Sequence, residues 1–439
     1  MEKRKILNRA LTRHIMIFAA LFCILSLYAV TYASEVDILV RKLVEKGILS
    51  KEEGEKILTE TKQEAAKEKD LAIKETKAAV AKDVSEGKLA FLPEWVRKTK
   101  ISGDFRLRYN YTEVDDQRSQ SQGRFRVRLN IETEIAKKVK FIFGLASGGN
   151  DPRSANQSFG SDWDKKQINI NYAYVEYTPY KWLKLEGGKM ANPVYTVSQL
   201  MWDEDVNPEG AAAQVAYPMN PCLNLLLNAG AFVLQDNKNN TPIDPWMWVI
   251  QPGFSWKSEK GLQGKFAAGY TSFENFQDNP QQKYSSGTNS YYNVGGTNYY
   301  KYKYNLATMA GEVGIKNPIP SFAPIRYAGV FGEYVNNVAT SNGKSGYLTG
   351  LTFGDEKVVE KGQWYFRGNW RRLERNAVPD TFPDSEFYFG DTGVSGYELV
   401  FRYGLWKNIN LQTRYVRSEQ ISGPAEPANL IQTDLNFKF

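Results

Sequence analysis

Between Lys100 and Phe439, repeated segments of the chain alternate apolar and polar side chains with a period of two. Residues 104–109 read Asp-Phe-Arg-Leu-Arg-Tyr, and residues 124–129 read Arg-Phe-Arg-Val-Arg-Leu. A β-strand places successive side chains on opposite faces, so each such segment would have one apolar and one polar face. The pattern predicts antiparallel sheet, which occurs in soluble proteins as well as in membrane barrels.

The alternation recurs in about sixteen segments that are separated by turn signals. They are residues 100–112, 123–135, 138–148, 167–178, 182–190, 209–217, 222–234, 247–257, 261–273, 300–316, 325–336, 345–355, 361–373, 394–406, 409–419 and 429–439. The fourth segment changes parity near Tyr172, which predicts a bulge.

The connections between these segments alternate in length. Odd-numbered gaps are long and polar, and most even-numbered gaps are tight. The long gaps are residues 113–122, 149–166, 191–208, 235–246, 274–299, 337–344, 374–393 and 420–428. An even strand count with long and short connections on opposite sides predicts an all-β, 16-stranded antiparallel transmembrane barrel over residues 93–439, with both termini on the short-turn, periplasmic side.

Aromatic residues near the strand ends agree with a barrel. They include Tyr180, Trp182, Trp256 and Trp406, and rings in such places form interfacial girdles against outer-membrane lipid. The chain also ends in an alternating segment that closes on Phe439. This ending resembles the recognition signal of outer-membrane barrel proteins, which implies insertion by the barrel assembly machinery.

Residues 1–33 have the features of a secretory signal peptide. Five basic residues precede a short apolar run at 15–30, and Ala33 offers a small residue for cleavage before Ser34. A retained membrane helix is the alternative, but the run is short for a membrane span. We therefore expect export to the outer membrane with cleavage of this signal.

Residues 34–92 form a separate segment with a helical pattern. Apolar residues at helical spacing predict a helix that ends at Gly47, and Ser50 with Glu53 makes a capping box for the next helix. The sequence then becomes rich in Lys, Glu and Ala, with few apolar positions. A periplasmic coiled coil that needs partner chains, with cell-wall contact through residues 35–90, and a solvated spacer are both open interpretations.

The order of these features resembles the putative porin family of Gram-negative outer membranes, which is distantly similar to general and phosphate-selective porins. The resemblance covers about residues 95–439. It rests on the arginine-rich first strands, on Ala173-Tyr-Val-Glu-Tyr177 and Leu183-Lys-Leu-Glu-Gly-Gly-Lys189, and on Leu200-Met-Trp-Asp-Glu-Asp-Val-Asn-Pro-Glu-Gly210. It implies a pore that is often a homotrimer.

The inward parity of the first two strands selects five arginines, which we call the arginine wall. They are Arg106, Arg108, Arg124, Arg126 and Arg128. Like charges on one dry face would repel, whereas in a water-filled lumen they persist and set selectivity. The alternative is a packed polar interior in which they pair with Asp104, Glu132 or Glu134. Arg326, Arg367, Arg371, Arg402 and Arg414 would extend the wall.

The third long gap, residues 191–208, carries an acidic cluster. It comprises Asp203, Glu204 and Asp205, with Glu209 at the start of the next strand. The cluster would form a constriction loop that opposes the arginine wall across a water-filled gap. A calcium loop of the EF-hand type fails, because Pro208 stands where glycine is needed. A solvated outer loop remains the alternative.

Composition argues against several other functions. Without residues 1–33 the net charge falls from +7 to +3, which gives no reason to expect nucleic acid as a partner. The only histidine, His14, leaves with the signal, and Cys222 is then the sole cysteine, so an internal disulfide is excluded. No catalytic motif is recognisable, and we expect no enzyme activity, cofactor or metal site.

Three functions follow, in order of preference. The first is a diffusion channel that passes small hydrophilic solutes or ions through a charge-lined pore. The second is a structural envelope anchor that uses the N-terminal helical segment. The third is a barrel enzyme. The sequence does not identify the solute or distinguish anion from cation preference.

Overall fold

The computed structural model describes residues 40, 42–54, 56–57, 93–114, 119–237, 243–319, 324–423 and 426–439. The chain divides into two compact units, Met1–Pro93 and Glu94–Phe439. The expected signal peptide and most of residues 34–92 lie outside the described residues. Among the residues that are described, no helix is long and apolar enough to cross a membrane.

The described part of the first unit contains the expected helix boundary. Residues 42–45 are helical, and Gly47 follows with a φ of +69°. The Ser50 backbone N–H donates to Glu53 Oε2 at 2.9 Å, and the Glu53 N–H donates to Ser50 Oγ at 3.2 Å. The predicted capping box is therefore present.

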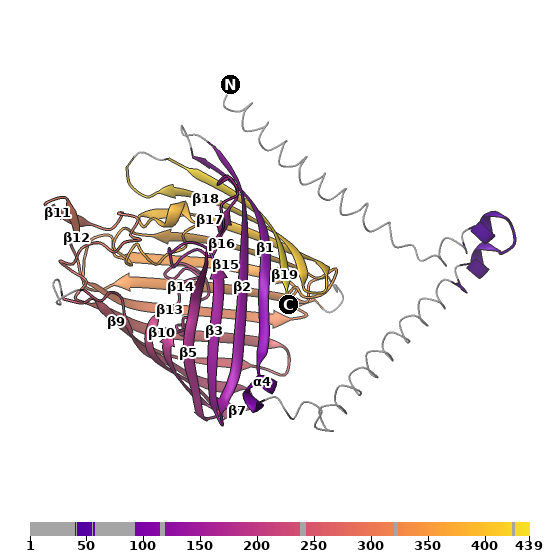
Figure 1. Cartoon of the computed structure of the whole chain (residues 1–439), viewed down its shortest axis with the longest axis horizontal. Coiled ribbons are helices and arrows are strands. Elements are labelled where there is room, and N and C mark those ends of the chain that lie inside the picture. The colour runs from indigo at the N-terminus through magenta and orange to yellow at the C-terminus, as the bar shows by residue number, and fades with distance from the viewer. Residues whose placement is uncertain are drawn as a thin grey trace. The chain divides into compact units, whose positions relative to one another are not determined.

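The second unit begins with the short helix α4 (Glu94–Arg97) and continues into a barrel (Figure 1). Sixteen strands form it, each antiparallel to its neighbours, and β1 pairs with β19 to close the sheet. The strands are β1 (Lys100–Val114), β2 (Gln120–Ala136), β3 (Val139–Ser147), β5 (Ile168–Tyr180), β6 (Leu183–Lys189), β7 (Glu209–Asn220), β8 (Leu223–Val233), β9 (Trp246–Lys257), β10 (Leu262–Glu274), β13 (Tyr304–Lys316), β14 (Tyr327–Asn337), β15 (Ser345–Gly354), β16 (Trp364–Leu373), β17 (Val394–Trp406), β18 (Ile409–Gln420) and β19 (Ala428–Lys438). The predicted fold class is confirmed.

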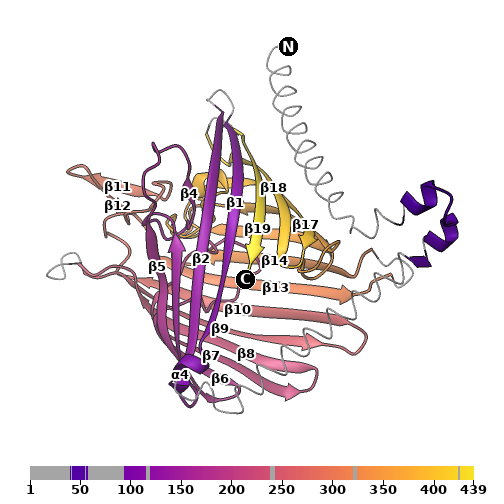
Figure 2. The same cartoon turned by 45° about the vertical axis from the view of Figure 1, so that its right-hand side comes forward.

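Three short strands lie outside the barrel wall. β4 (Gln157–Ser158) adds to the top of β2, and β11 (Tyr291–Val294) pairs with β12 (Thr297–Tyr300). Figure 2 shows this hairpin projecting from the end of the barrel that carries the long loops. The predicted segment 300–316 therefore starts too early, because Tyr300 belongs to the hairpin and the barrel strand begins at Tyr304.

The register agrees with the predicted bulge. Gly144 pairs with Tyr172 and Leu145 pairs with Ile170, so Asn171 is the extra residue on β5. By contrast, the first connection is shorter than residues 113–122. β1 continues to Val114 and β2 begins at Gln120, so this gap is tight although it lies on the long-loop side.

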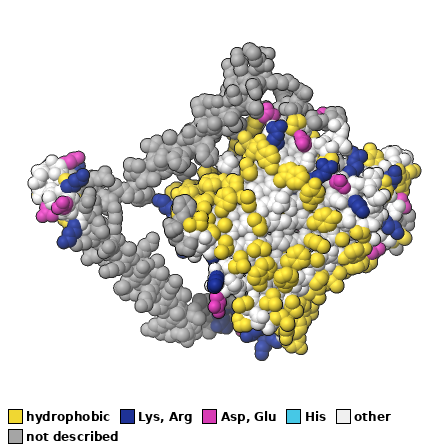
Figure 3. Space-filling view, turned by 180° about the vertical axis from the view of Figure 1, so that it is seen from behind, with side chains coloured by type: hydrophobic (Ala, Val, Ile, Leu, Met, Phe, Trp, Pro, Cys, Tyr) yellow, Lys and Arg dark blue, Asp and Glu magenta, His cyan; other side chains and the backbone are white. Residues whose placement is uncertain are grey.

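The two faces of the wall differ as the alternation requires. Leu107 and Phe254 are among the apolar side chains exposed on the outer face, whereas Arg106 and Arg108 are buried inside. Figure 3 shows hydrophobic side chains spread over the outer surface of the barrel. Exposed apolar residues in such a band are what lipid contact requires.

Part of the barrel interior is a hydrophobic core. It contains Trp202 and Phe382 from two long loops, together with Phe273, Leu306 and Phe331 from the wall. The wall strands that contribute to it are β7–β10 and β13–β16. The core therefore fills one side of the lumen and holds the loops in place.

Candidate functional site

The segment 191–208 enters the barrel and crosses its interior. The Tyr195 N–H donates to Gln251 on β9 at 2.9 Å, and the Tyr195 hydroxyl donates to Glu312 on β13 at 3.2 Å. Ser198 donates to Glu333 on β14 at 2.9 Å. These contacts lie on the wall opposite β1 and β2.

The apolar residues of this segment explain its inward path. Leu200, Met201 and Trp202 are all less than 5% exposed. The Trp202 ring centroid lies 4.8 Å from that of Phe382 and 6.4 Å from that of Phe273. Burying such side chains favours the inward conformation by roughly 1.5–3 kcal/mol for each large apolar residue.

A second loop, residues 374–393, folds inward and packs against the first. The Asp203 N–H donates to the Phe382 carbonyl at 2.7 Å, and the Asp384 N–H donates to the Gln199 carbonyl at 3.3 Å. Sequence reasoning missed this loop as part of the site. Its stretch Ala377-Val-Pro-Asp-Thr-Phe-Pro-Asp-Ser-Glu-Phe387 combines prolines, acids and aromatics as residues 191–208 do, and that similarity was the available signal.

The arginine wall lies inside the barrel, but its charges are largely paired. Arg108 donates from Nε and Nη2 to the two oxygens of Asp434 on β19, at 2.6 and 2.8 Å. Its Nη1 lies 2.5 Å from Glu386 of the second loop. Arg124 is 3.5 Å from the same carboxylate, and Arg106 donates to Asn156 at 2.7 Å and lies 3.8 Å from Asp434.

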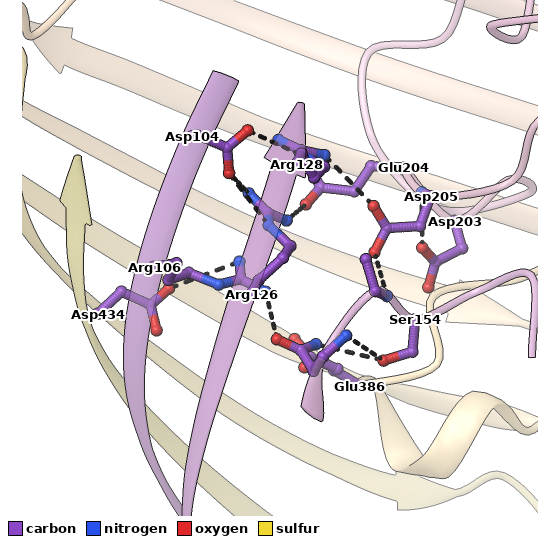
Figure 4. A network of polar contacts seen from close by, with 12 residues as sticks. Asp104, Arg106, Arg126, Arg128, Ser154, Asp203, Glu204, Asp205, Glu386 and Asp434 are labelled. Carbon is purple, nitrogen blue, oxygen red and sulfur yellow. Dashed lines mark hydrogen bonds and ion pairs between the residues drawn. The ribbon is translucent and has the colours of Figure 1, made fainter. Parts of the chain in front are cut away.

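The acidic loop meets the wall in direct ion pairs (Figure 4). Arg126 lies 3.0 Å from Asp104 on β1 and 3.6 Å from Glu204. Arg128 lies 2.7 Å from Asp104 and 3.4 Å from Asp205. At Arg126 and Arg128 the loop therefore contacts the wall directly. The expected water-filled gap between the acidic loop and the arginine wall does not exist at these two residues.

The other two acids of the predicted cluster have different partners. Asp203 accepts hydrogen bonds from the backbone N–H and the hydroxyl of Ser385, each at 2.9 Å, and so joins the two loops. Glu209 lies at the start of β7, where it pairs with Lys189 at 2.9 Å and is exposed. Of the four acids, only Glu204 and Asp205 meet arginines of the wall.

The five arginines that were expected to extend the wall also differ in their partners. Arg371 and Arg414 lie 2.8 and 2.6 Å from Asp384, so they too pair with the second loop. Arg367 bonds to the carbonyl of Val197, and Arg402 bonds to Gln412. Among the described residues these last two arginines have no carboxylate partner. Arg326 lies apart, in a short turn, where it pairs with Asp355 at 3.0 Å.

The loop acids titrate differently because their surroundings differ. Burial and the neighbouring Asp384 raise the pKa of Asp203 well above its ordinary value. Burial would also raise the pKa of Glu386, but Arg108 and Arg414 outweigh it and hold that pKa well below the ordinary value. Glu386 is therefore a fixed negative charge that neutralises part of the wall.

A cavity of about 530 Å³ lies between these groups. Ten basic and seven acidic side chains are among its lining residues, which come mainly from β1, β2, β16–β19 and the two loops. The hydrophobic core lies mainly against other strands, and the two regions meet at β15 and β16. Polar solutes therefore have the charged side of the lumen available to them. Within the described residues, no group of three or more acidic, histidine or cysteine side chains is placed to hold a metal ion.

A closed sixteen-stranded barrel with charged loops folded into its lumen defines an outer-membrane channel. The sequence matches the family described as "Putative porin" over residues 112–305 and 299–439, which is more than half of the chain. The chain belongs to this family, and it is an outer-membrane porin channel. Family and fold indicate a channel rather than an enzyme.

One solved structure supports the fold, and a second is reported for comparison. OprB from Pseudomonas putida is similar with a TM-score of 0.52 and 12% identity, over 79% of this chain and 96% of that one. A triple mutant of the Rhodopseudomonas blastica porin gives a TM-score of 0.44 and 13% identity, over 78% of this chain and 100% of that one. Among curated proteins, none matches the sequence.

Proposed function

We propose that the protein passes small hydrophilic solutes by passive diffusion along the charged side of its lumen, with a preference for anions. The observation that carries the preference is the lining of the cavity, where basic side chains outnumber acidic ones by ten to seven. Selectivity follows the charges at the narrow part of a pore.

Two features strengthen this preference. Arg367 and Arg402 face the cavity without a carboxylate partner among the described residues, so their fields act on a passing solute. Asp203 has a raised pKa because it is buried, so this acid opposes the arginines less than a solvated aspartate would. Glu204, with 57% of its side chain exposed, is the acid best placed to attract cations.

Reversal potentials in planar bilayers under a salt gradient test the proposal. Wild-type protein should be anion-selective, Glu204→Gln should increase that selectivity, and Arg402→Gln should decrease it. Glu209→Gln and Arg326→Gln serve as matched controls, because these residues lie outside the cavity lining and should leave the reversal potential unchanged. A cation-selective wild type, or shifts of the same size in the controls, would refute the proposal.

We further propose a homotrimer that is exported with cleavage of residues 1–33 and carries residues 34–92 as a periplasmic helical segment. Insertion would use the C-terminal strand. In its support, the Phe439 N–H donates to the Gly103 carbonyl at 3.1 Å and the Gly103 N–H donates back at 2.9 Å, at the seam that closes the barrel. Mass spectrometry of the purified protein checks both the mature N-terminus and the trimer, and deletion of residues 34–92 should leave conductance unchanged.

A further inference from the structure

A second cavity, of about 370 Å³, lies inside the barrel near its short-turn end, and we call it the short-turn cavity. Its lining comes from β9, β10 and β13–β16, which lie side by side in the wall (Figure 1). Lys257 and Gln263, which both line it, pair across the short turn between β9 and β10. The cavity shares Tyr365 and Arg367 with the larger cavity at the arginine wall. A solute that passes the arginine wall can therefore reach it.

The strand register shows which side chains of these strands face the lumen. Glu312 on β13 faces inward, because the hydroxyl of Tyr195 in the inward-folded loop donates to it at 3.2 Å. Lys265 on β10 and Phe331 on β14 both pair directly with Glu312. By contrast, the neighbouring Val330 is exposed on the outer face. Residues of the same parity on adjacent strands share one face of a sheet, so Lys265 and Phe331 face the lumen as well.

The ring of Tyr327 packs on the inner wall, where glycine occupies two neighbouring inward positions. A Cβ at Gly314 on β13 would collide with the hydroxyl end of Tyr327, and a Cβ at Gly329 would lie 3.1 Å from the same hydroxyl oxygen. Glycine in a strand interior often marks such a close approach. The ring therefore occupies the space that two side chains would take, and it presents an aromatic surface to the short-turn cavity that it lines.

A second ring fixes the orientation of Arg367. Phe331 occupies the space above Gly350, where a Cβ would collide with its ring. The Arg367 guanidinium carbon lies 3.6 Å from the Phe331 ring centroid, and one nitrogen bonds to the carbonyl of Val197 in the inward-folded loop. A guanidinium has five N–H donors in a planar fork, so donors remain that can bind a carboxylate.

The short-turn cavity has an excess of positive charge. Its basic residues are Lys257, Lys265 and Arg367, and none of them forms an ion pair with a carboxylate in the part of the chain that the structure describes. Of the two acids in the lining, Glu356 is neutralised by Lys316 at 2.7 Å. Glu312 keeps its charge while it accepts the hydrogen bond from Tyr195. Three positive charges therefore stand against one negative charge that no ion pair neutralises, which favours an anionic ligand.

We propose that the short-turn cavity binds small aromatic carboxylates on their way through the pore. This inference rests on the proposed function, because the ligand reaches the cavity through the lumen. The carboxylate would bind the guanidinium of Arg367 or a lysine ammonium, and the ring would pack on Tyr327 and Tyr365. Aromatic pairs are stabilised beyond the burial of their area. An aliphatic carboxylate would use the cations without this gain, so the cavity would bind it more weakly.

Block of the potassium chloride current in planar bilayers at neutral pH tests this proposal. Benzoate is compared with cyclohexanecarboxylate, which has the same charge and a similar size but no aromatic ring. The concentration that halves the current should be about two- to tenfold lower for benzoate. Tyr327→Leu should abolish this difference, whereas Tyr327→Phe should retain it. Lys257→Gln should weaken block by both acids, by up to about fivefold.

Two matched controls lie outside the short-turn cavity. Tyr334→Leu replaces a tyrosine on the outer face of the same strand, β14, and Lys407→Gln removes a lysine from another short turn. Both should show the wild-type difference between the two acids. Equal block by both acids in the wild type, or the same loss in Tyr334→Leu as in Tyr327→Leu, would overturn the proposal.

Reversal potentials on the same membranes separate this inference from the proposed function. Equal block by the two acids in an anion-selective wild type would overturn the aromatic carboxylate site and leave the proposed function standing. A cation-selective wild type that benzoate still blocks preferentially, with loss of that preference in Tyr327→Leu, would support the site and refute the anion preference alone.

Discussion

Replacement of Arg108 by methionine asks whether the arginine wall is a packed, paired structure or a solvated lining. Arg108 is only 5% exposed. It makes two hydrogen bonds to Asp434 and a third contact to Glu386. Glu386 would keep Arg414 at 3.0 Å. Within the part of the chain that the structure describes, Asp434 would keep only Arg106 at 3.8 Å and a weak bond from Gln412 at 3.4 Å.

These contacts determine how much stability the Arg108→Met substitution should remove. Removing one partner of a buried ion pair leaves an uncompensated charge and costs about 3–5 kcal/mol. Arg108→Met should therefore lower the free energy of unfolding by about that amount. Asp434→Asn should also destabilise, and the double variant should lose less than the sum, with a coupling energy of about 2 kcal/mol, as residues in direct contact show.

The assay is denaturant unfolding in detergent micelles, followed by tryptophan fluorescence. Lys189→Met provides the matched control, because Lys189 pairs with the exposed Glu209 and such a pair contributes about 0–1 kcal/mol. Additive effects of the two substitutions, or a cost for Arg108→Met as small as that of the control, would refute the reasoning. The wall would then be solvated, as in a wide water-filled pore.

Three further predictions concern the loops and the seam. Trp202→Ala should remove the contact with Phe382 and about 3–5 kcal/mol of packing; single-channel recordings should show noisier conductance. Gly103→Ala should destabilise the strands around the seam by about 1–3 kcal/mol, because its Cβ would lie 2.4 Å from the Arg128 carbonyl oxygen and 2.6 Å from the Phe439 ring; heat-modifiable mobility reports this. Burial raises the pKa of Asp391 to about 6, so stability should fall as pH rises from its ordinary 3.8 through that value; Asp391→Asn should flatten this part of the unfolding profile.

The strands were predictable because lipid and lumen impose opposite polarity on alternate residues. Fifteen of the sixteen segments match the barrel strands within a few residues, and the exception, at residues 300–316, fails for a physical reason. Tyr300 continues the alternation, but it pairs in the β11–β12 hairpin. The start of β2 was also missed, because Gln120-Ser-Gln122 is polar on both faces.

The site was predictable only in part. Strand parity selected Arg106, Arg108 and Arg126, and these are buried inside the barrel. It did not reveal their partners, because Asp434 lies 326 residues from Arg108 in the sequence. Pairing across the closing seam and to a loop depends on the three-dimensional closure of the barrel, which local alternation does not encode. Of the partners considered from sequence, Asp104 pairs with the wall, whereas Glu132 pairs with Lys140.

The paired wall changes how selectivity should be altered by mutation. An arginine such as Arg108 contributes to packing and to the field in the lumen at once, so its removal confounds the two. Glu204 is different, because most of its side chain is exposed and its nearest arginine is 3.6 Å away. Neutralising it changes the charge of the cavity while the buried pairs stay in place. Substitution of exposed loop acids such as Glu204 should therefore change ion selectivity without unfolding the barrel. Substitution of the buried, paired arginines should change selectivity and stability together.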